Sequence, residues 1–400
     1  MSIIADKMNI IKPSPTLEIA GKAMQLKAMG FDVISLSAGE PDFDTPNSVK
    51  DAAIKAINAG KTKYTLVDGT IELKEAISYK IYADYGIRYN IQQISVGAGA
   101  KQCIYNLFMA TLNPGNEVLI PSPYWVSYTD IVKIAGGKPV IINCNETFKL
   151  SAELLEQSIT KNTKWLVINS PNNPTGMVYT KKELKDIAQV LLRYPHVYVM
   201  TDDIYAKLVY GVKFVNIIQA ESALYDRVFI VNGVSKAYAM TGWRIGYITG
   251  DEKIIKAISI IQSQSTTNPN SIAQAAAVEA LMGDQDFLKE RLKLFSERRD
   301  IVMNMVSNTP GLSAILPQGA FYVFISCEKM IGMKTKNDLI IRDGTDFSKY
   351  LLQDYNVAVV PGDAFGAANF FRISYATSSE QLLIACERIN KACAELSSFL

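Results

Sequence analysis

The middle of the chain alternates short apolar runs, rich in β-branched residues, with longer segments of helical periodicity. The runs EVLIPSP, KWLVINSP, VYVMTDD, RVFIVNG and WRIGYITG have the length and composition of buried strands. KKELKDIAQVLLRY and the stretch after VGAGAKQ instead repeat apolar residues at helical spacing. This alternation predicts an α/β fold, in which a largely parallel sheet carries helices on both faces.

The pattern changes after about residue 285. FLKERLKLFSERRDIVMNMV predicts a long amphipathic helix, and AFYVFIS, VAVVPGD and FFRISYA predict shorter strands before a final helix. We therefore expect a large domain over residues 46–284 and a smaller C-terminal α/β domain over residues 285–400. Residues 1–45 should form an N-terminal arm and join the smaller domain through ISLSAGEPDFDTP.

Composition and charge exclude several classes of function. The 400 residues are 48% hydrophobic, which is enough to bury a large core. Lys and Arg total 41 against 39 Asp and Glu, and the absence of a long basic run argues against a nucleic-acid partner. No apolar run reaches membrane-spanning length, and MSIIADKMNIIKPSP lacks the features of a signal peptide. We expect a cytoplasmic protein with no membrane partner.

The cysteines and histidine exclude several classes of site. The five cysteines are scattered and form no CxxC pair, so a disulfide framework or a zinc site is not expected. His196 is the only histidine, which argues against a Ser-His-Asp triad and a histidine-rich metal site. We expect no metal, although a site built from carboxylates alone remains open.

Polar residues gather where predicted strands end. SVGAGAKQCIYNLF reads as a strand, a glycine turn and a helix start, an arrangement that offers backbone N–H groups to a phosphate. Asn173 lies in the turn SPNNPTG, and Asp202 and Tyr205 follow the strand VYVM. Each segment also has a plain structural interpretation, as a tight turn or as a helix cap.

The segment VNGVSKAYAMTGWRIGY adds two cations to this set. Lys236 follows a strand, where burial would lower its pKa and make it a nucleophile. Arg244 is expected in the next strand, placed to hold a phosphate with two hydrogen bonds. Taken singly, each cation is more often a surface or ion-paired residue. Taken together, the groups match pyridoxal 5′-phosphate, whose ring nitrogen would pair with Asp202 and whose aldehyde would condense with Lys236.

Ten motifs, in order and spacing, resemble those of the class I aminotransferases of fold type I. They are SAGEPDFDTP, KYTLVDG, GAGAKQ, SPYWVSY, SPNNPTG, TDDIY, SKAYAMTGWRIGY, GAFYVF, VPGDAFG and FRISYATS. The resemblance covers essentially the whole chain and is closest to the bacterial aspartate aminotransferases, a subgroup that includes aspartate/prephenate aminotransferases. It implies a large domain with a mostly parallel seven-stranded sheet between helices, and a smaller C-terminal domain.

The resemblance also implies the cofactor site. Lys236 matches the family's Schiff-base lysine, Arg244 its phosphate-binding arginine and Asp202 the partner of the pyridine nitrogen. Tyr205 and Asn173 match the residues that bind the cofactor's phenolic oxygen.

Further matches surround the ring and the phosphate. Trp125 matches the aromatic residue that stacks on the ring, and Gly99, Ala100 and Lys101 match the phosphate cradle. Tyr64 matches a tyrosine that reaches the partner subunit's phosphate, which implies a homodimer with shared sites. One departure is that GAGAK offers backbone N–H groups in place of a hydroxyl; another is that Gly233 stands where the family pattern leads us to expect a hydroxyl side chain.

Substrate-binding residues are implied in the same way. Arg372 matches the arginine that holds the α-carboxylate, and Gly39 matches a glycine beside that carboxylate, near Trp125 and Asn173. Lys101 stands where this subgroup is thought to bind a second carboxylate, and Lys12 with Thr16 resembles a segment linked to prephenate. Without the resemblance, Arg372 reads as a strand-edge ion pair and Lys12 as a solvated lysine.

The implied reaction is transfer of the amino group of L-aspartate to 2-oxoglutarate, with prephenate as an additional acceptor and with ping-pong kinetics. The same scaffold supports other aminotransferases, C–S β-lyases and decarboxylases, which the sequence separates poorly. A ligand-sensing module of a transcription regulator would need a DNA-binding unit, and the recognised motifs already begin by residue 35. A plain nucleotide-binding protein would not explain Lys236 together with Asp202 and Asn173.

Overall fold

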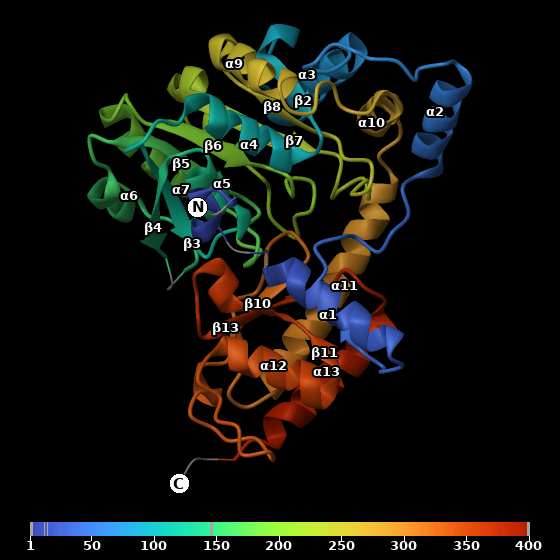
Figure 1. Cartoon of the computed structure of the whole chain (residues 1–400), viewed down its shortest axis with the longest axis vertical. Helices are drawn as coiled ribbons and strands as arrows, with labels where there is room; N and C mark the ends of the chain where they lie inside the picture. The colour runs from blue at the N-terminus through green and yellow to red at the C-terminus, as the bar shows by residue number, and fades with distance from the viewer. Residues whose placement is uncertain (1–2, 12, 14, 145–146, 398–400) are drawn as a thin grey trace.

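A twisted seven-stranded sheet forms the larger half of the molecule, shown in the upper part of Figure 1. The computed structural model describes residues 3–11, 13, 15–144 and 147–397. Neighbouring strands are parallel except at β8, which is antiparallel to both β2 and β7. In order across the sheet, the strands are β2 (Ile94–Gly97), β8 (Gly246–Thr249), β7 (Val228–Gly233), β6 (Tyr198–Asp202), β5 (Thr163–Asn169), β3 (Glu117–Ser122) and β4 (Lys138–Asn143).

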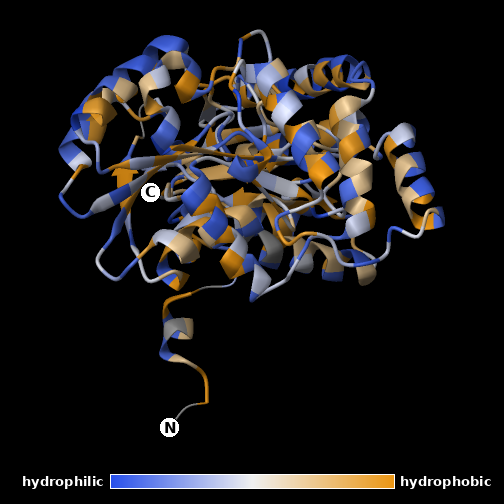
Figure 2. Ribbon diagram, turned by 90° about the horizontal axis from the view of Figure 1, so that it is seen from above, coloured by the Kyte–Doolittle hydropathy of each residue, from blue (hydrophilic) through white to orange (hydrophobic). Residues whose placement is uncertain are grey.

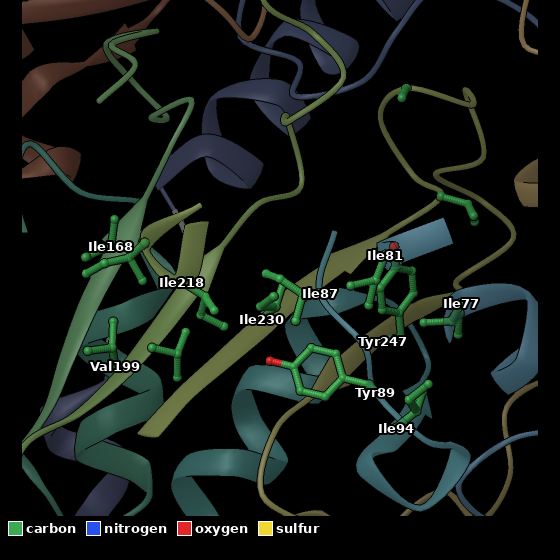
Figure 3. Packing of buried hydrophobic residues seen from close by; sticks show 14 of the residues in the cluster. Ile77, Ile81, Ile87, Tyr89, Ile94, Ile168, Val199, Ile218, Ile230 and Tyr247 are labelled. Atoms are coloured by element: carbon green, nitrogen blue, oxygen red, sulfur yellow. The ribbon is translucent and has the colours of Figure 1, made fainter. Parts of the chain in front are cut away.

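Helices cover both faces of this sheet, as the alternating pattern predicts. One face packs against α4 (Ala100–Thr111), α5 (Ser127–Ile134) and α9 (Glu252–Ser263). The other carries the largest apolar cluster, part of which is shown in Figure 3. Its helices are α2 (Asn47–Asn58), α3 (Ile71–Tyr85), α6 (Ala152–Ser158), α7 (Lys181–Arg193), α8 (Ile217–Ala220) and α10 (Ser271–Met282).

The smaller half is built on an antiparallel sheet of order β12-β13-β10-β9. Its strands are β9 (Ser313–Ala314), β10 (Tyr322–Ser326), β12 (Val360–Pro361) and β13 (Phe370–Ser374), and a separate parallel pair joins β1 (Ile34–Ser35) to β11 (Val357–Ala358). Around them lie α1 (Pro15–Ala28), α11 (Phe287–Asn308), α12 (Gly344–Tyr355) and α13 (Ser379–Ala394). Short 3-10 helices complete the elements: η1 (Asp6–Ile10), η2 (Ile91–Gln93), η3 (Ser222–Arg227), η4 (Glu328–Met330) and η5 (Gly362–Phe365).

Two segments connect the halves. The chain leaves β1 in the smaller half and enters the larger half at α2, and it returns through α11. Leu288, near the start of α11, packs in the cluster of the large sheet, whereas Phe295 packs in that of the small one. We propose domain boundaries between residues 45 and 46 and between residues 284 and 285. Each boundary then lies at one of the two connections. Among the described residues, no helix is both long and apolar enough to cross a membrane.

The structure differs from the predicted strands in three details. Arg244 lies in a turn before β8, with a φ of 57°, and not in the strand as expected. VAVVPGD forms two short strands in different sheets, because β11 pairs with β1 and β12 with β13. The pattern also missed β4, KPVIIN, whose exposed ends and Pro139 resemble a loop; proline is tolerated there because β4 is an edge strand.

The approach of β8 to α4 generates a stability prediction. A Cβ on Gly246 would lie 2.1 Å from the Ala100 nitrogen, so Gly246→Ala must push two backbones apart. We expect a loss of about 1–3 kcal/mol in the free energy of unfolding, measured by urea denaturation. Gly21→Ala is the matched control, because nothing lies within 4 Å of its Cβ and alanine favours a helix. Equal stability of the two variants would contradict this packing.

Candidate active site

A cavity of about 450 Å³ opens at the carboxyl ends of β5, β6 and β7. This volume is within the usual range for small-molecule sites, and the position is where open α/β sheets bind ligands. Both halves contribute to its walls, because β10 and β13 close it from the side of the smaller sheet. Its lining includes Lys236, Asp202, Arg372, Asn173, Trp125 and Arg244.

Lys236 lies three residues beyond the end of β7. Its side chain lines the cavity, and its amine lies deep in the protein and donates a hydrogen bond to the Gly39 carbonyl. Burial, reinforced by the nearby charge of Arg372, lowers the pKa of Lys236 to about 8. Near neutral pH the neutral, nucleophilic fraction of this amine is therefore much larger than that of a lysine with the ordinary pKa.

Asp202 ends β6 and is only 6% exposed. Its Oδ2 accepts a hydrogen bond from the Tyr128 hydroxyl at 2.7 Å, and its Oδ1 accepts one from the Ile204 amide at 3.3 Å. Burial raises the pKa of Asp202, while these hydrogen bonds and the charge of Lys236 oppose that effect. A buried carboxylate of this kind would be stabilised by a cationic ligand atom.

The glycine turn and Arg244 meet at one end of the cavity. Gly99 precedes α4 with a φ of 86°, and a Cβ there would lie 2.3 Å from a terminal nitrogen of Arg244. The Arg244 guanidinium is exposed and donates to the carbonyls of Ala98 and Thr241. Lys101 is exposed beside it, with its ammonium 4.9 Å from the centre of the Trp125 ring. The helix start and two cations form a site for an anion such as phosphate.

Arg372 comes from β13 in the smaller half and is 2% exposed. Its terminal nitrogens donate to Asn173 Oδ1 at 2.9 Å and to the Ser37 carbonyl at 2.7 Å. Its Nε is buried without a partner, and the Tyr322 ring lies 4.3 Å from the guanidinium carbon. Burial lowers the pKa of Arg372, and the guanidinium remains charged because its ordinary value is so high. A buried cation with an unused donor suits a carboxylate ligand.

Sequence reasoning missed three residues that organise this site. Tyr128 bonds Asp202, and the Tyr322 hydroxyl lies 2.8 Å from that of Tyr205. Asn169, at the end of β5, donates to the Asp202 carbonyl at 2.9 Å and accepts from the Asn173 amide at the same distance. Tyr128 and Tyr322 stand in SPYWVSY and GAFYVF, so those motifs were the available signal.

The geometry of this single chain does not test three of the expected residues. Tyr64 is 90% exposed and does not line the cavity. Lys12 is outside the described residues, as is the side chain of Thr16 in α1, although Ala20 of the same helix borders the cavity. No cluster of His, Cys, Asp or Glu suitable for a metal ion occurs in the part of the chain that the structure describes.

One of the two departures in the phosphate region, at Gly233, has a structural explanation. A Cβ on Gly233 would lie 2.9 Å from both the Cα of Gly246 and the carbonyl of Ile245, so a hydroxyl side chain does not fit there. Ser235 lines the cavity nearby and can supply a hydroxyl group. The cavity therefore combines the amides at the start of α4 and a hydroxyl for an anion, a buried carboxylate, an amine of lowered pKa and a buried guanidinium.

Comparisons with known proteins agree with this chemistry. The family model "Aminotransferase class I and II" matches residues 32–389. A relative from Rickettsia bellii, named probable aspartate/prephenate aminotransferase, is 54% identical over 99% of this chain and 100% of its own length. The crystal structure of the aspartate aminotransferase from Rhizobium meliloti superposes with a TM-score of 0.96 at 51% identity, covering 99% of this chain and 100% of that one. The Thermus thermophilus aspartate aminotransferase with maleate gives a TM-score of 0.92 at 39% identity, covering 98% and 100%.

The lowered pKa of Lys236 can be measured without any ligand. Only a neutral amine reacts with cyanate, so carbamylation of Lys236 should rise with pH around a midpoint of about 8. Lys182 is the internal control, since its ion pair with Asp186 raises its pKa above the ordinary 10.5. Peptide mass spectrometry across the pH range reports both residues. A Lys236 profile that follows that of Lys182 would contradict the assigned burial.

Proposed function

The chain belongs to the aminotransferase class I and II family, and from this premise we propose that it transfers the amino group of L-aspartate to 2-oxoglutarate. The products are oxaloacetate and L-glutamate. The observation that carries the proposal is that one cavity holds a partly buried lysine of lowered pKa, a buried aspartate and a buried arginine with an unused donor. A binding protein for an anionic ligand would have no need of the activated lysine.

We propose pyridoxal 5′-phosphate as the cofactor. Its phosphate would bind the start of α4, Arg244 and Ser235, and its ring nitrogen would pair with Asp202. Trp125 would pack on the ring, and Tyr205 with Asn173 would bind the phenolic oxygen. When bound, this group supplies an aldehyde for the substrate amine and a ring that withdraws electrons from the α-carbon.

The protein's own groups then position the substrate and move its proton. Arg372 holds the α-carboxylate, which fixes the orientation of the α-carbon relative to Lys236. The neutral Nζ of Lys236, released from the Gly39 carbonyl, takes the α-proton as a general base. Tyr128 keeps the carboxylate of Asp202 in place, and its hydrogen bond favours the ionised form.

Acidic substrates fit the charges at the cavity mouth. Lys101 lines the same cavity as Arg372 and is a second cation there, which favours a substrate with two carboxylates. The Thermus thermophilus structure named above was obtained with maleate, which is such a dicarboxylate. Prephenate also combines a 2-oxo acid with a second carboxylate, and we propose it as a further amino acceptor, with Lys12 and Thr16 near its site.

We further propose a homodimer in which Tyr64 reaches the partner's phosphate. The loop before α3 that carries Tyr64 is held by two buried glutamines, because Gln274 donates to Thr65 and Gln262 donates to the Val67 carbonyl. The N-terminal segment projects from the body in Figure 2 and exposes Ile3, which suits an arm that packs on a second copy.

We also propose that the protein is cytoplasmic. All five cysteines are buried and unpaired, which fits a reducing compartment such as the cytoplasm.

The first experiment follows the absorbance of the purified protein with added pyridoxal 5′-phosphate and then with aspartate alone. We expect a visible band that shifts towards the ultraviolet while oxaloacetate appears in an amount equal to the sites. Lys236→Ala should lose the band of the lysine-bound cofactor and nearly all turnover. A colourless, inactive wild-type protein would contradict the proposal. Normal turnover by the variant would exclude Lys236 as the nucleophile.

Arg372→Lys tests the carboxylate site. Lysine keeps the positive charge but loses the planar fork, so KM for aspartate should rise about tenfold to a hundredfold, the effect of one lost charge-assisted hydrogen bond. Arg388→Lys, in an ion pair with Asp32 outside the cavity, is the control and should leave KM unchanged. Steady-state kinetics with aspartate distinguish the two, and equal KM values would place the α-carboxylate elsewhere.

A further inference from the structure

The segment from Ser37 to Thr45, called the crossing segment below, carries backbone groups into the active site. The Ser37 carbonyl accepts a hydrogen bond from Arg372, and the Gly39 carbonyl accepts one from Lys236. Glu40 accepts one from Thr241. Arg372 and Lys236 are the two side chains that an amino acid substrate must engage, and this segment holds both of them in the free protein.

The same segment is held at its other end by one face of α11. Both terminal nitrogens of Arg298 donate to the carboxylate of Asp42, at 2.7 and 2.8 Å. The ring of Phe43 packs edge-on against Phe295, with ring centres 5.2 Å apart. Arg291 donates to the Asp44 carbonyl at 2.6 Å. Residues 291, 295 and 298 follow helical spacing, so α11 presents a single face to the segment.

The contact between Arg298 and Asp42 is stronger than a surface ion pair. Arg298 is 4% exposed, and its two parallel hydrogen bonds fix the direction as well as the distance of the carboxylate. Asp42 is three residues from Gly39, a reach of at most about 10 Å of extended chain. Asp42 is therefore close in the chain to the carbonyls of Gly39 and Ser37, which touch Lys236 and Arg372.

We propose that Arg298 is a positioning residue, which acts through Asp42 to set the placement of the crossing segment and so the affinity for the amino acid substrate. The pair also ties the two connections between the halves to each other, so that α11 and the segment move as one body. The kinetic part of this inference rests on the proposed function, whereas the structural part concerns the segment alone.

Arg298→Lys and Asp42→Asn test the pair in the full-length protein with its cofactor. Each variant loses the two-point contact, and each should raise KM for aspartate about tenfold while kcat changes by less than about threefold. The double variant should be no worse than the more affected single one, because either change already breaks the pair. Arg299→Lys is the matched control, since Arg299 is the next residue of α11, is 13% exposed in its side chain and pairs with Asp300.

Amide hydrogen exchange, measured by mass spectrometry without substrate, supplies a second readout. Peptides that include Leu36, whose amide donates to the Ala358 carbonyl directly before the segment, should exchange at least about tenfold faster in both single variants and normally in Arg299→Lys, with peptides elsewhere unchanged. Unchanged KM and exchange would overturn the proposal, as would faster exchange throughout the chain with parallel losses of kcat. If the wild-type protein fails to transaminate aspartate, the proposed function fails, and exchange at Leu36 still decides whether Arg298 positions the segment.

Discussion

A lysine ammonium group loses hydration when it moves from water into a protein, and Lys236 is held where that loss is compensated only in part. Burial and the charge of Arg372 disfavour its protonated form, while Glu40 and Asp202 favour it, and the balance lowers its pKa. Three parts of the chain create these surroundings of the amine. The Gly39 carbonyl holds it, the end of β7 places it, and the smaller half brings Arg372 close to it.

The second requirement is close approach of backbones at the anion-binding end. Gly246 of β8 lies against the first residues of α4, and Gly233 of β7 lies against Gly246. These contacts leave no room for a Cβ. They place the free amides at the start of α4 beside the cavity at the carboxyl ends of the strands, where Lys236 and Asp202 also lie. The missing hydroxyl at Gly233 is thus a consequence of packing, with Ser235 lining the cavity nearby.

The third feature is that both halves of the molecule, each with its own apolar core, contribute residues to the substrate site. Asp202 ends a strand of the large sheet and Lys236 follows the next one, whereas Arg372 lies in the small sheet. Their separation depends on α11 and on the crossing segment, which are the two connections between the cores. A contact such as Arg298 with Asp42 can therefore influence substrate affinity without touching the substrate.

The sequence by itself determined the elements and the chemistry. Hydrophobic periodicity predicted the strands of the large sheet except β4, and strand ends followed by Asp202, Asn173 and Lys236 predicted where a ligand binds, because these signals are local. Only the tertiary structure decided which side chains form hydrogen bonds with one another. Tyr128 is 74 residues from Asp202, and Tyr322 is 117 residues from Tyr205, and such contacts depend on strand order and on the docking of the smaller half. Arg244 shows the same limit, since the sequence pattern placed it in a strand, whereas it lies in a turn with a φ of 57° and its guanidinium reaches the Ala98 carbonyl, 146 residues away.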